Sequence, residues 1–128
     1  MIVGIGCDVV DHMSGKLLKW ETDITILKRL LSSTEIKLFN SYKRNKIRFV
    51  AGRFAGKEAV LKCLGTGMQD GISLTEIKII QTSNGQPSVK LSGEVQKIAN
   101  LLKINTWHIS ITHSRSTSIA FAIAENNK

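Results

Sequence analysis

The spacing of apolar residues predicts one short strand followed by helices in the first part of the chain. Residues 2–7 are rich in β-branched side chains and indicate a buried strand that ends near Asp8. Apolar positions then recur at helical spacing over residues 16–42. Within that stretch, Ser32 and Glu35 match a capping box, so we expect a helix to begin there.

The most clearly helical segment is 46–64, which contains good helix formers and no proline and stops at Gly65. The pattern then changes to strands over 75–81 and 88–91, a helix over about 92–102, and strands over 106–112 and 118–124. The chain has no internal repeat and no linker-like tract. Residues 1–128 are therefore predicted to form a single α+β domain, with a largely antiparallel sheet packed on the long central helix.

Cysteine usage and the N-terminal residues bear on the compartment. Cys7 and Cys63 are far apart and form no CxxC pair, which favours small buried packing residues in a reducing cytosol. The first ten residues lack the basic leader of a signal peptide, and no apolar run approaches the ~20 residues that span a bilayer. We expect a cytoplasmic protein that does not associate with membranes.

The net charge of +8 favours an anionic partner, such as nucleic acid, a phosphorylated metabolite or an acidic protein. A solvated basic surface would give the same composition. A nucleic-acid-binding module would need aromatic side chains among its basic residues. The chain has two Trp, one Tyr and four Phe, and the pattern of the long helix already uses Phe49 and Phe54 for packing. We therefore do not expect a nucleic acid partner.

Acidic and basic residues of the predicted strand and long helix form the first candidate site. Asp8 follows the strand, and the helix carries two pairs at i,i+4 spacing, Glu58 with Lys62 and Arg53 with Lys57. Carboxylates that hold a divalent cation, beside cations that neutralise phosphate oxygens, suit pyrophosphate chemistry. A turn aspartate, a surface salt bridge and a solvated basic patch would explain the same residues, and spacing alone does not separate these interpretations.

Two further segments are candidates for ligand contact. Gly65 and Thr66 follow the long helix, where glycine either ends the helix or lets backbone approach a ligand. His113 lies where a predicted strand meets its turn, and could donate to a phosphate. A nucleophilic pair of His113 with Ser110 is not expected, because no G-x-S-x-G elbow is present. There is also no GxxxxGK[ST] loop, which disfavours a P-loop nucleotidase.

Four motifs in order along the chain resemble one family. They are GIGCDVVD at 4–11, FVAGRFAGKEA at 49–59, NGQP at 84–87 and HISITH at 108–113. Each motif alone is weak or moderate, but the ordered set covers nearly the whole chain. It resembles the holo-[acyl-carrier-protein] synthases, the small single-domain group of 4′-phosphopantetheinyl transferases.

This resemblance implies a transferase of phosphopantetheinyl transferase-like fold. It would move 4′-phosphopantetheine from coenzyme A to a serine of apo-acyl carrier protein, release adenosine 3′,5′-bisphosphate and support fatty acid biosynthesis. Asp8 and Glu58 would bind Mg²⁺, Glu58 or a metal-bound water would be the base, and Lys62 would stabilise charge on the phosphate. The residues that it implies at the coenzyme site are Arg53, Lys57, Lys62, Gly65, Thr66 and His113.

The resemblance also implies a homotrimer with active sites between subunits and an acidic carrier protein that meets residues 13–28. Ser14 stands where the family usually has an arginine, so lysines would have to supply the contacts there. Besides the nucleic-acid-binding module, a second alternative is another magnesium-dependent phosphotransferase or hydrolase on the same scaffold. It would use Asp8 and Glu58 similarly and need no carrier protein.

Overall fold

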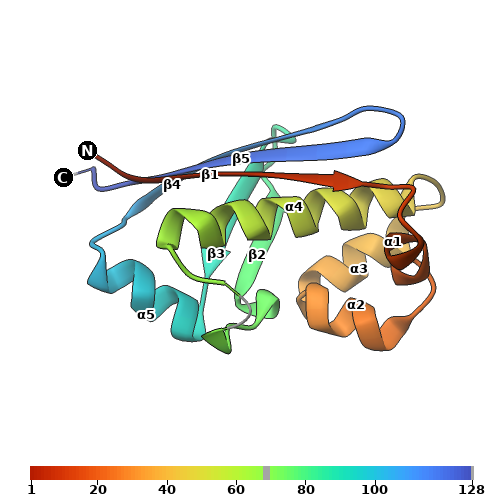
Figure 1. Ribbon diagram of the computed structural model, residues 1–128, viewed down its shortest axis with the longest axis horizontal. Helices are drawn as coiled ribbons and strands as arrows, with labels where there is room; N and C mark the ends of the chain where they lie inside the picture. Colours follow the sequence, from red (N-terminus) through yellow and green to blue (C-terminus); the bar gives the residue numbers. More distant parts are fainter. Residues whose placement is uncertain (68–69, 128) are drawn as a thin grey trace.

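The structure is a computed structural model that describes residues 1–67 and 70–127 (Figure 1). The strands are β1 (Ile2–Asp11), β2 (Ile77–Gln81), β3 (Pro87–Leu91), β4 (Thr106–His113) and β5 (Thr117–Glu125). The helices are α1 (Gly15–Trp20), α2 (Ile24–Leu30), α3 (Ser33–Ser41), α4 (Lys46–Leu64) and α5 (Gly93–Leu101), and the 3-10 turn η2 spans Leu74–Glu76. This order confirms the predicted α+β class.

Two antiparallel sheets lie on different sides of α4. Strands β1, β5 and β4 form a three-stranded sheet in that order, and β2 and β3 form a separate hairpin. Figure 1 shows the three-stranded sheet along the top of the molecule and α4 directly beneath it, with the other helices below and the hairpin crossing the line of α4. Helix α4 is therefore the central element, as the sequence predicts.

The stretch 16–42 contains three short helices because polar caps interrupt it. Ser14, Asp23 and Ser32 each cap a helix by accepting a hydrogen bond from a backbone N–H of its first turn. The capping box is confirmed, since Glu35 also accepts from the backbone N–H of Ser32 at 2.8 Å. These caps place α1, α2 and α3 beside one end of α4 (Figure 1).

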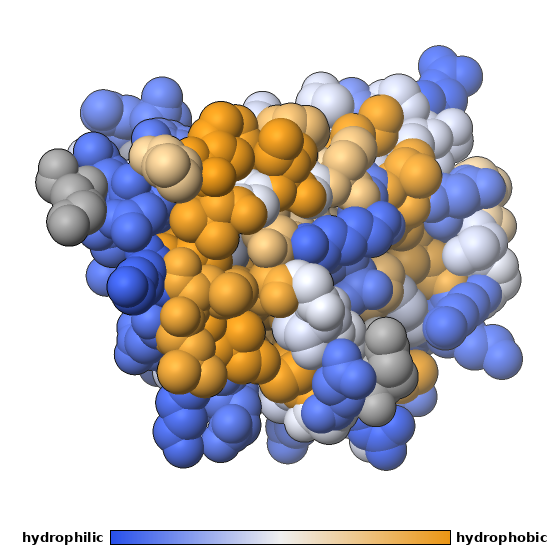
Figure 2. Space-filling model, turned by 60° about the vertical axis from the view of Figure 1, so that its left-hand side comes forward, coloured by the Kyte–Doolittle hydropathy of each residue, from blue (hydrophilic) through white to orange (hydrophobic). Residues whose placement is uncertain are grey.

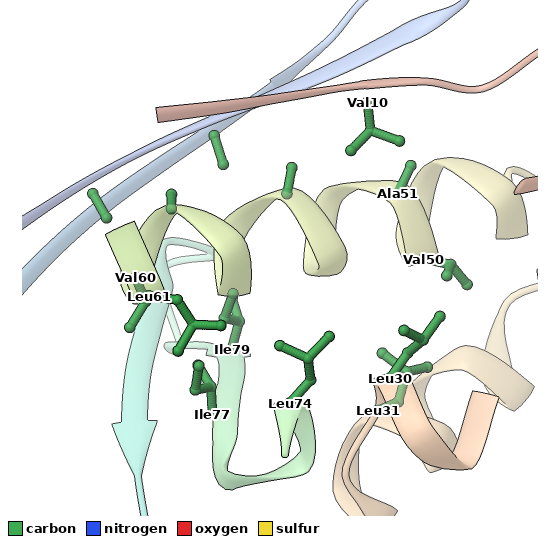
Figure 3. Close-up of a cluster of buried hydrophobic side chains, with 14 of the residues drawn as sticks. Val10, Leu30, Leu31, Val50, Ala51, Val60, Leu61, Leu74, Ile77 and Ile79 are labelled. Carbon is green, nitrogen blue, oxygen red and sulfur yellow. The ribbon is translucent and has the colours of Figure 1, made fainter. Parts of the chain in front are cut away.

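The hydrophobic core surrounds α4 on nearly every side. Val50 and Val60 are fully buried, and Figure 3 shows side chains of α2, η2 and β2 below the helix and Val10 of β1 above it. A helix that is hydrophobic all round is typically buried, and α4 has buried residues throughout its length, the charged Arg53 and Lys57 among them. None of the helices in the described ranges is both long and apolar enough to cross a bilayer.

Candidate active site

Strand β1 lies directly on the backbone of α4, because two of its inward-facing residues have no side chain. A Cβ atom on Gly6 would overlap the carbonyl oxygen of Ala59, and one on Gly4 would overlap the carbonyl oxygen of Cys63. Alternate residues of a strand face the same side. Asp8 therefore faces α4 as the two glycines do, and the close crossing brings its carboxylate to the helix surface.

The predicted end of the first strand at Asp8 is wrong. Strand β1 continues to Asp11, and Asp8 pairs with Ala120 in the middle of the ladder with β5. The alternation of side chains continues through Val9 and Val10, of which Val9 is exposed and Val10 is buried. Asp8 is thus held by strand pairing on a rigid element, and its side chain keeps 20% of its surface exposed.

Asp8, Glu58 and Lys62 come together where β1 crosses α4. The Lys62 ammonium donates to the backbone carbonyl of Cys7 at 2.8 Å and to Oδ1 of Asp8 at 3.4 Å. Partial burial raises the pKa of Glu58, the nearby Asp8 carboxylate raises it further, and Lys62 opposes both effects. The structure therefore places two neighbouring carboxylates beside one ammonium.

This donor set suits a hard divalent cation that keeps several other ligands. The residues placed by the structure contain no cluster of three or more His, Cys, Asp or Glu side chains that could hold a metal. Mg²⁺ is usually bound through one or two carboxylates, with waters and substrate phosphates completing its octahedron. A cation between Asp8 and Glu58 would also relieve the repulsion that raises the pKa of Glu58. The two carboxylates therefore fit Mg²⁺.

A second group of basic side chains lies further toward the N-terminus of α4. The Arg53 guanidinium is buried over the ring of Phe49 and donates from Nε to the carbonyl of Ile79 at 3.1 Å, while Nη2 has no hydrogen-bond partner within residues 1–67 and 70–127. His113, the last residue of β4, lies against Gly52, where a Cβ atom would come 2.8 Å from its Cε1. A guanidinium N–H group that lacks a partner among the described residues, beside a histidine, suits an anion.

Comparison with known proteins decides the family. The model of the 4′-phosphopantetheinyl transferase superfamily matches residues 4–124. The chain belongs to this superfamily. It is 38% identical over 126 residues to the holo-[acyl-carrier-protein] synthase of Hydrogenovibrio crunogenus, covering 98% of each chain. The resemblance and the enzyme class inferred from the motifs are thus confirmed.

Solved structures of similar proteins have the same fold. The holo-[acyl-carrier-protein] synthase of Neisseria meningitidis has a TM-score of 0.86 at 28% identity, covering 98% of this chain and 99% of the other. The enzyme of Bacillus anthracis, in complex with coenzyme A (3′,5′-ADP), has a TM-score of 0.81 at 30% identity, covering 99% of each chain. The phosphopantetheinyl transferase fold predicted from the motifs is confirmed.

The structure corrects the place of one predicted coenzyme residue of this transferase. Lys57 is fully buried and donates to the carbonyl of Leu30 at 2.6 Å, to Oε1 of Glu35 at 2.6 Å and to the carbonyl of Leu74 at 3.1 Å. All three ammonium hydrogens are used, so Lys57 neither lines a ligand site nor belongs to a solvated basic patch. Desolvation lowers the pKa of Lys57, and the ion pair with Glu35 opposes this effect.

The segment after α4 ends the helix in the way that glycine predicts. Gly65 adopts a left-handed conformation with φ of 72°, and its N–H donates to the carbonyls of Leu61 and Lys62. Thr66 donates its hydroxyl hydrogen to Asp70 at 2.7 Å. The helix stop is therefore confirmed, and contact of Gly65 and Thr66 with a coenzyme stays a prediction.

Sequence reasoning missed Ser118, which contacts His113, and His12, which contacts Ser118. The buried Oγ of Ser118 lies 2.6 Å from Nδ1 of His113 and 2.6 Å from Nε2 of His12, which is itself 4% exposed. His12 directly follows β1, so its place after the opening motif was a usable signal, whereas Ser118 is identified only by strand register. His108 of the last motif is exposed and bonds Glu125 at 2.9 Å.

Proposed function

We propose that the protein transfers 4′-phosphopantetheine from coenzyme A to a serine of an apo-acyl carrier protein in a Mg²⁺-dependent reaction. The observation that carries this proposal is the meeting of Asp8, Glu58 and Lys62 at the crossing of β1 and α4. The full-length similarity to holo-[acyl-carrier-protein] synthases supports the choice of substrates. An enzyme of this kind would serve fatty acid biosynthesis.

The three residues have distinct roles in the proposed mechanism. Asp8 and Glu58 would hold Mg²⁺, which when bound would act as a Lewis acid on the diphosphate of coenzyme A. Glu58, beside the proposed cation, takes the proton of the carrier serine directly or through a water. The serine oxygen then bonds to the phosphorus that bears the pantetheine arm, and the bond from that phosphorus to the adenosine 3′,5′-bisphosphate oxygen breaks. Lys62 stabilises the charge that develops on the phosphate oxygens.

Arg53 and His113 are the residues that we propose for a phosphate of the nucleotide. Burial lowers the pKa of His113, and the positive charges of Arg48 and Arg53, with His12, lower it further. A site where cations repel one another gains from a bound anion. Nη2 of Arg53, which has no partner among the residues that the structure describes, would donate to the same phosphate.

The carrier protein would dock where α1 and α2 meet α4. The rings of Trp20 and Phe54 meet edge to face, with their centroids 4.9 Å apart. Both line a pocket of about 590 Å³, and its other lining residues include Lys16, Lys19 and Arg29. An apolar floor with basic residues suits an acidic amphipathic helix. Ser14 adds no positive charge to this pocket. Its hydroxyl oxygen instead caps α1 by accepting a hydrogen bond from the N–H of Leu17 at 3.2 Å.

The outer face of the three-stranded sheet supports self-association into the homotrimer that we propose, with active sites between subunits. Its exposed apolar residues include Ile5, Val9, Ile119 and Phe121, with exposed fractions between 41% and 63%. Figure 2 shows that apolar side chains gather over a broad area on one side of the molecule. Large exposed apolar patches mark interaction surfaces. Cys7, predicted to be buried, is exposed because it lies on the outward side of β1.

A cytoplasmic location completes the proposal. Cys7 and Cys63 are free thiols, which suits a reducing compartment. The proposal includes neither a nucleic acid partner nor a membrane one.

Mass spectrometry of the carrier protein tests the proposed reaction. The protein is incubated with coenzyme A, Mg²⁺ and apo-acyl carrier protein, and the carrier serine should gain ~340 Da as phosphopantetheine is transferred. Asp8→Ala and Glu58→Ala should abolish the gain, while Ser110→Ala, on the outer side of β4, should not. No gain with several carrier proteins would reject the transfer. Hydrolysis of coenzyme A without a carrier would support the alternative of a magnesium-dependent hydrolase.

A further inference from the structure

One buried serine connects two histidines at the edge of the proposed coenzyme site. Ser118 of β5 is fully buried, and register places it opposite Val10 of β1 on one side and His113 of β4 on the other. His12 follows β1, and its Nε2 lies 2.6 Å from the Ser118 hydroxyl. Nδ1 of His113 lies at the same distance from that hydroxyl. Three strand segments thus hold a His12–Ser118–His113 chain of hydrogen bonds.

The chemistry of a hydroxyl group couples the two rings. A serine has one hydrogen to donate and otherwise accepts. If Ser118 donates to Nδ1 of His113, Nε2 of His12 must carry the hydrogen of the other bond. If Ser118 donates to His12 instead, Nδ1 of His113 must carry a hydrogen. The direction of the chain therefore sets which nitrogen of His113 is protonated whenever that ring is neutral.

The surroundings of His113 favour a neutral ring, and a bound phosphate then favours the first direction. Arg48 and Arg53 of α4 and the His12 ring lie near His113, and burial together with these positive charges lowers its pKa, which favours the neutral ring. A neutral ring that accepts at Nδ1 keeps its hydrogen on Nε2, the nitrogen on the side of Gly52. In the opposite direction Nε2 would present a lone pair, which repels a phosphate oxygen.

We propose that His12 and Ser118 are positioning residues of the coenzyme site, and that they hold neutral His113 with its Nε2–H directed to a phosphate of the substrate. His12 donates to Ser118, and Ser118 donates to His113. His113 thus serves as an anion donor without needing to be protonated. This inference rests on the proposed function, in which His113 meets a phosphate of coenzyme A.

Nuclear magnetic resonance tests the direction of the chain independently of activity. Long-range ¹H–¹⁵N spectra of the ¹⁵N-labelled protein, with the His113 signals assigned by their loss in His113→Gln, report which nitrogens carry hydrogens. We expect hydrogens on Nε2 of both His12 and His113 in the wild-type protein, and loss of this preference at His113 in Ser118→Ala. A wild-type His113 with its hydrogen on Nδ1 would overturn the inference.

Kinetics test the consequence for the substrate. Ser118→Ala and His12→Leu should raise KM for coenzyme A about five- to twentyfold, as expected for a weakened hydrogen bond to a charged group, with kcat within about twofold. His12→Gln keeps an N–H donor and should restore KM. His108→Gln is the control, because its ring lies on the outer side of β4. Unchanged KM together with an unchanged His113 tautomer in Ser118→Ala would reject the inference. If the wild-type protein showed no transfer, the proposed function would be rejected instead. The spectra would still report the direction of the His12–Ser118–His113 hydrogen bonds.

Discussion

The substitution Lys57→Met separates structural from catalytic roles on α4. It keeps the length of the side chain but removes the ammonium that bonds Leu30, Glu35 and Leu74. The carboxylate of Glu35 would remain buried with only the backbone N–H groups of Ser32 and Ile79 as partners. An uncompensated buried charge is among the few changes that destabilise a protein severely.

The expected magnitude follows from the burial of both partners. Breaking a fully buried ion pair from one side costs ~3–5 kcal/mol, against a total of ~5–15 kcal/mol for a domain. With a urea dependence of ~1–3 kcal/mol per M, the unfolding midpoint of Lys57→Met should fall by roughly 1–5 M. In the double variant Glu35→Gln/Lys57→Met neither partner leaves an unpaired buried charge, so most of the loss should be recovered. The double-mutant cycle of urea unfolding curves measures this coupling directly.

A matched substitution at Lys62 should behave in the opposite way. Its side chain is 55% exposed and makes one long ion pair with Asp8, so Lys62→Met should change stability by less than ~1 kcal/mol. In the proposed mechanism it should nevertheless reduce kcat strongly. The reasoning would be refuted if Lys57→Met unfolded like the wild-type protein, or if the folded double variant showed a large increase in KM for coenzyme A.

Three further predictions concern the Asp8 and Glu58 carboxylates, the crossing of β1 over α4, and the outer face of the three-stranded sheet. The pKa of Glu58 is raised above its ordinary 4.5, so the free energy of unfolding falls as pH rises through that raised pKa. Glu58→Gln should therefore unfold at a higher urea concentration than the wild type at neutral pH, and the unfolding midpoints of the two proteins should converge below about pH 4.5. Gly6→Ala should lose ~1–3 kcal/mol and most activity, because β1 must move off α4, whereas Gly15→Ala, which meets no atom within 4 Å, should stay within ~0.5 kcal/mol. Phe121→Glu on the outer sheet face should yield monomers by light scattering where the wild type gives trimers; equal masses would contradict the proposed assembly.

Local patterns were sufficient to predict most of the elements. The capping box at Ser32, the long helix and its glycine stop depend on neighbouring residues, and all are confirmed. The end of the first strand was misplaced because the apolar run stops at the polar Asp8. The strand in fact continues to Asp11, and its side chains still alternate between the two faces. The Ser118 contacts could not be predicted, since they depend on the register of three strands.

Helical geometry explains why one of two similar residue pairs forms the candidate site and the other does not. Residues four apart lie close together on an α-helix, whereas residues one apart are turned by about 100°. Glu58 and Lys62 therefore share one face, and Arg53 and Lys57 share another. Spacing alone could not show what covers each face. The structure shows that β1 brings Asp8 to the first face, while the second face meets η2 and β2.

The second face differs along its length, and this decides which of its two cations can reach a ligand. At Lys57 the carbonyls of Leu30 and Leu74 and the carboxylate of Glu35 surround the ammonium completely. One turn nearer the start of α4, Arg53 has only the carbonyl of Ile79, and within the described chain its Nη2 is left without a partner. A buried unpaired donor is costly unless a ligand satisfies it. From the sequence alone, Arg53 and Lys57 are equivalent basic residues on one helix face. Packing uses all the hydrogens of the Lys57 ammonium, so of the two only Arg53 can donate to an anion.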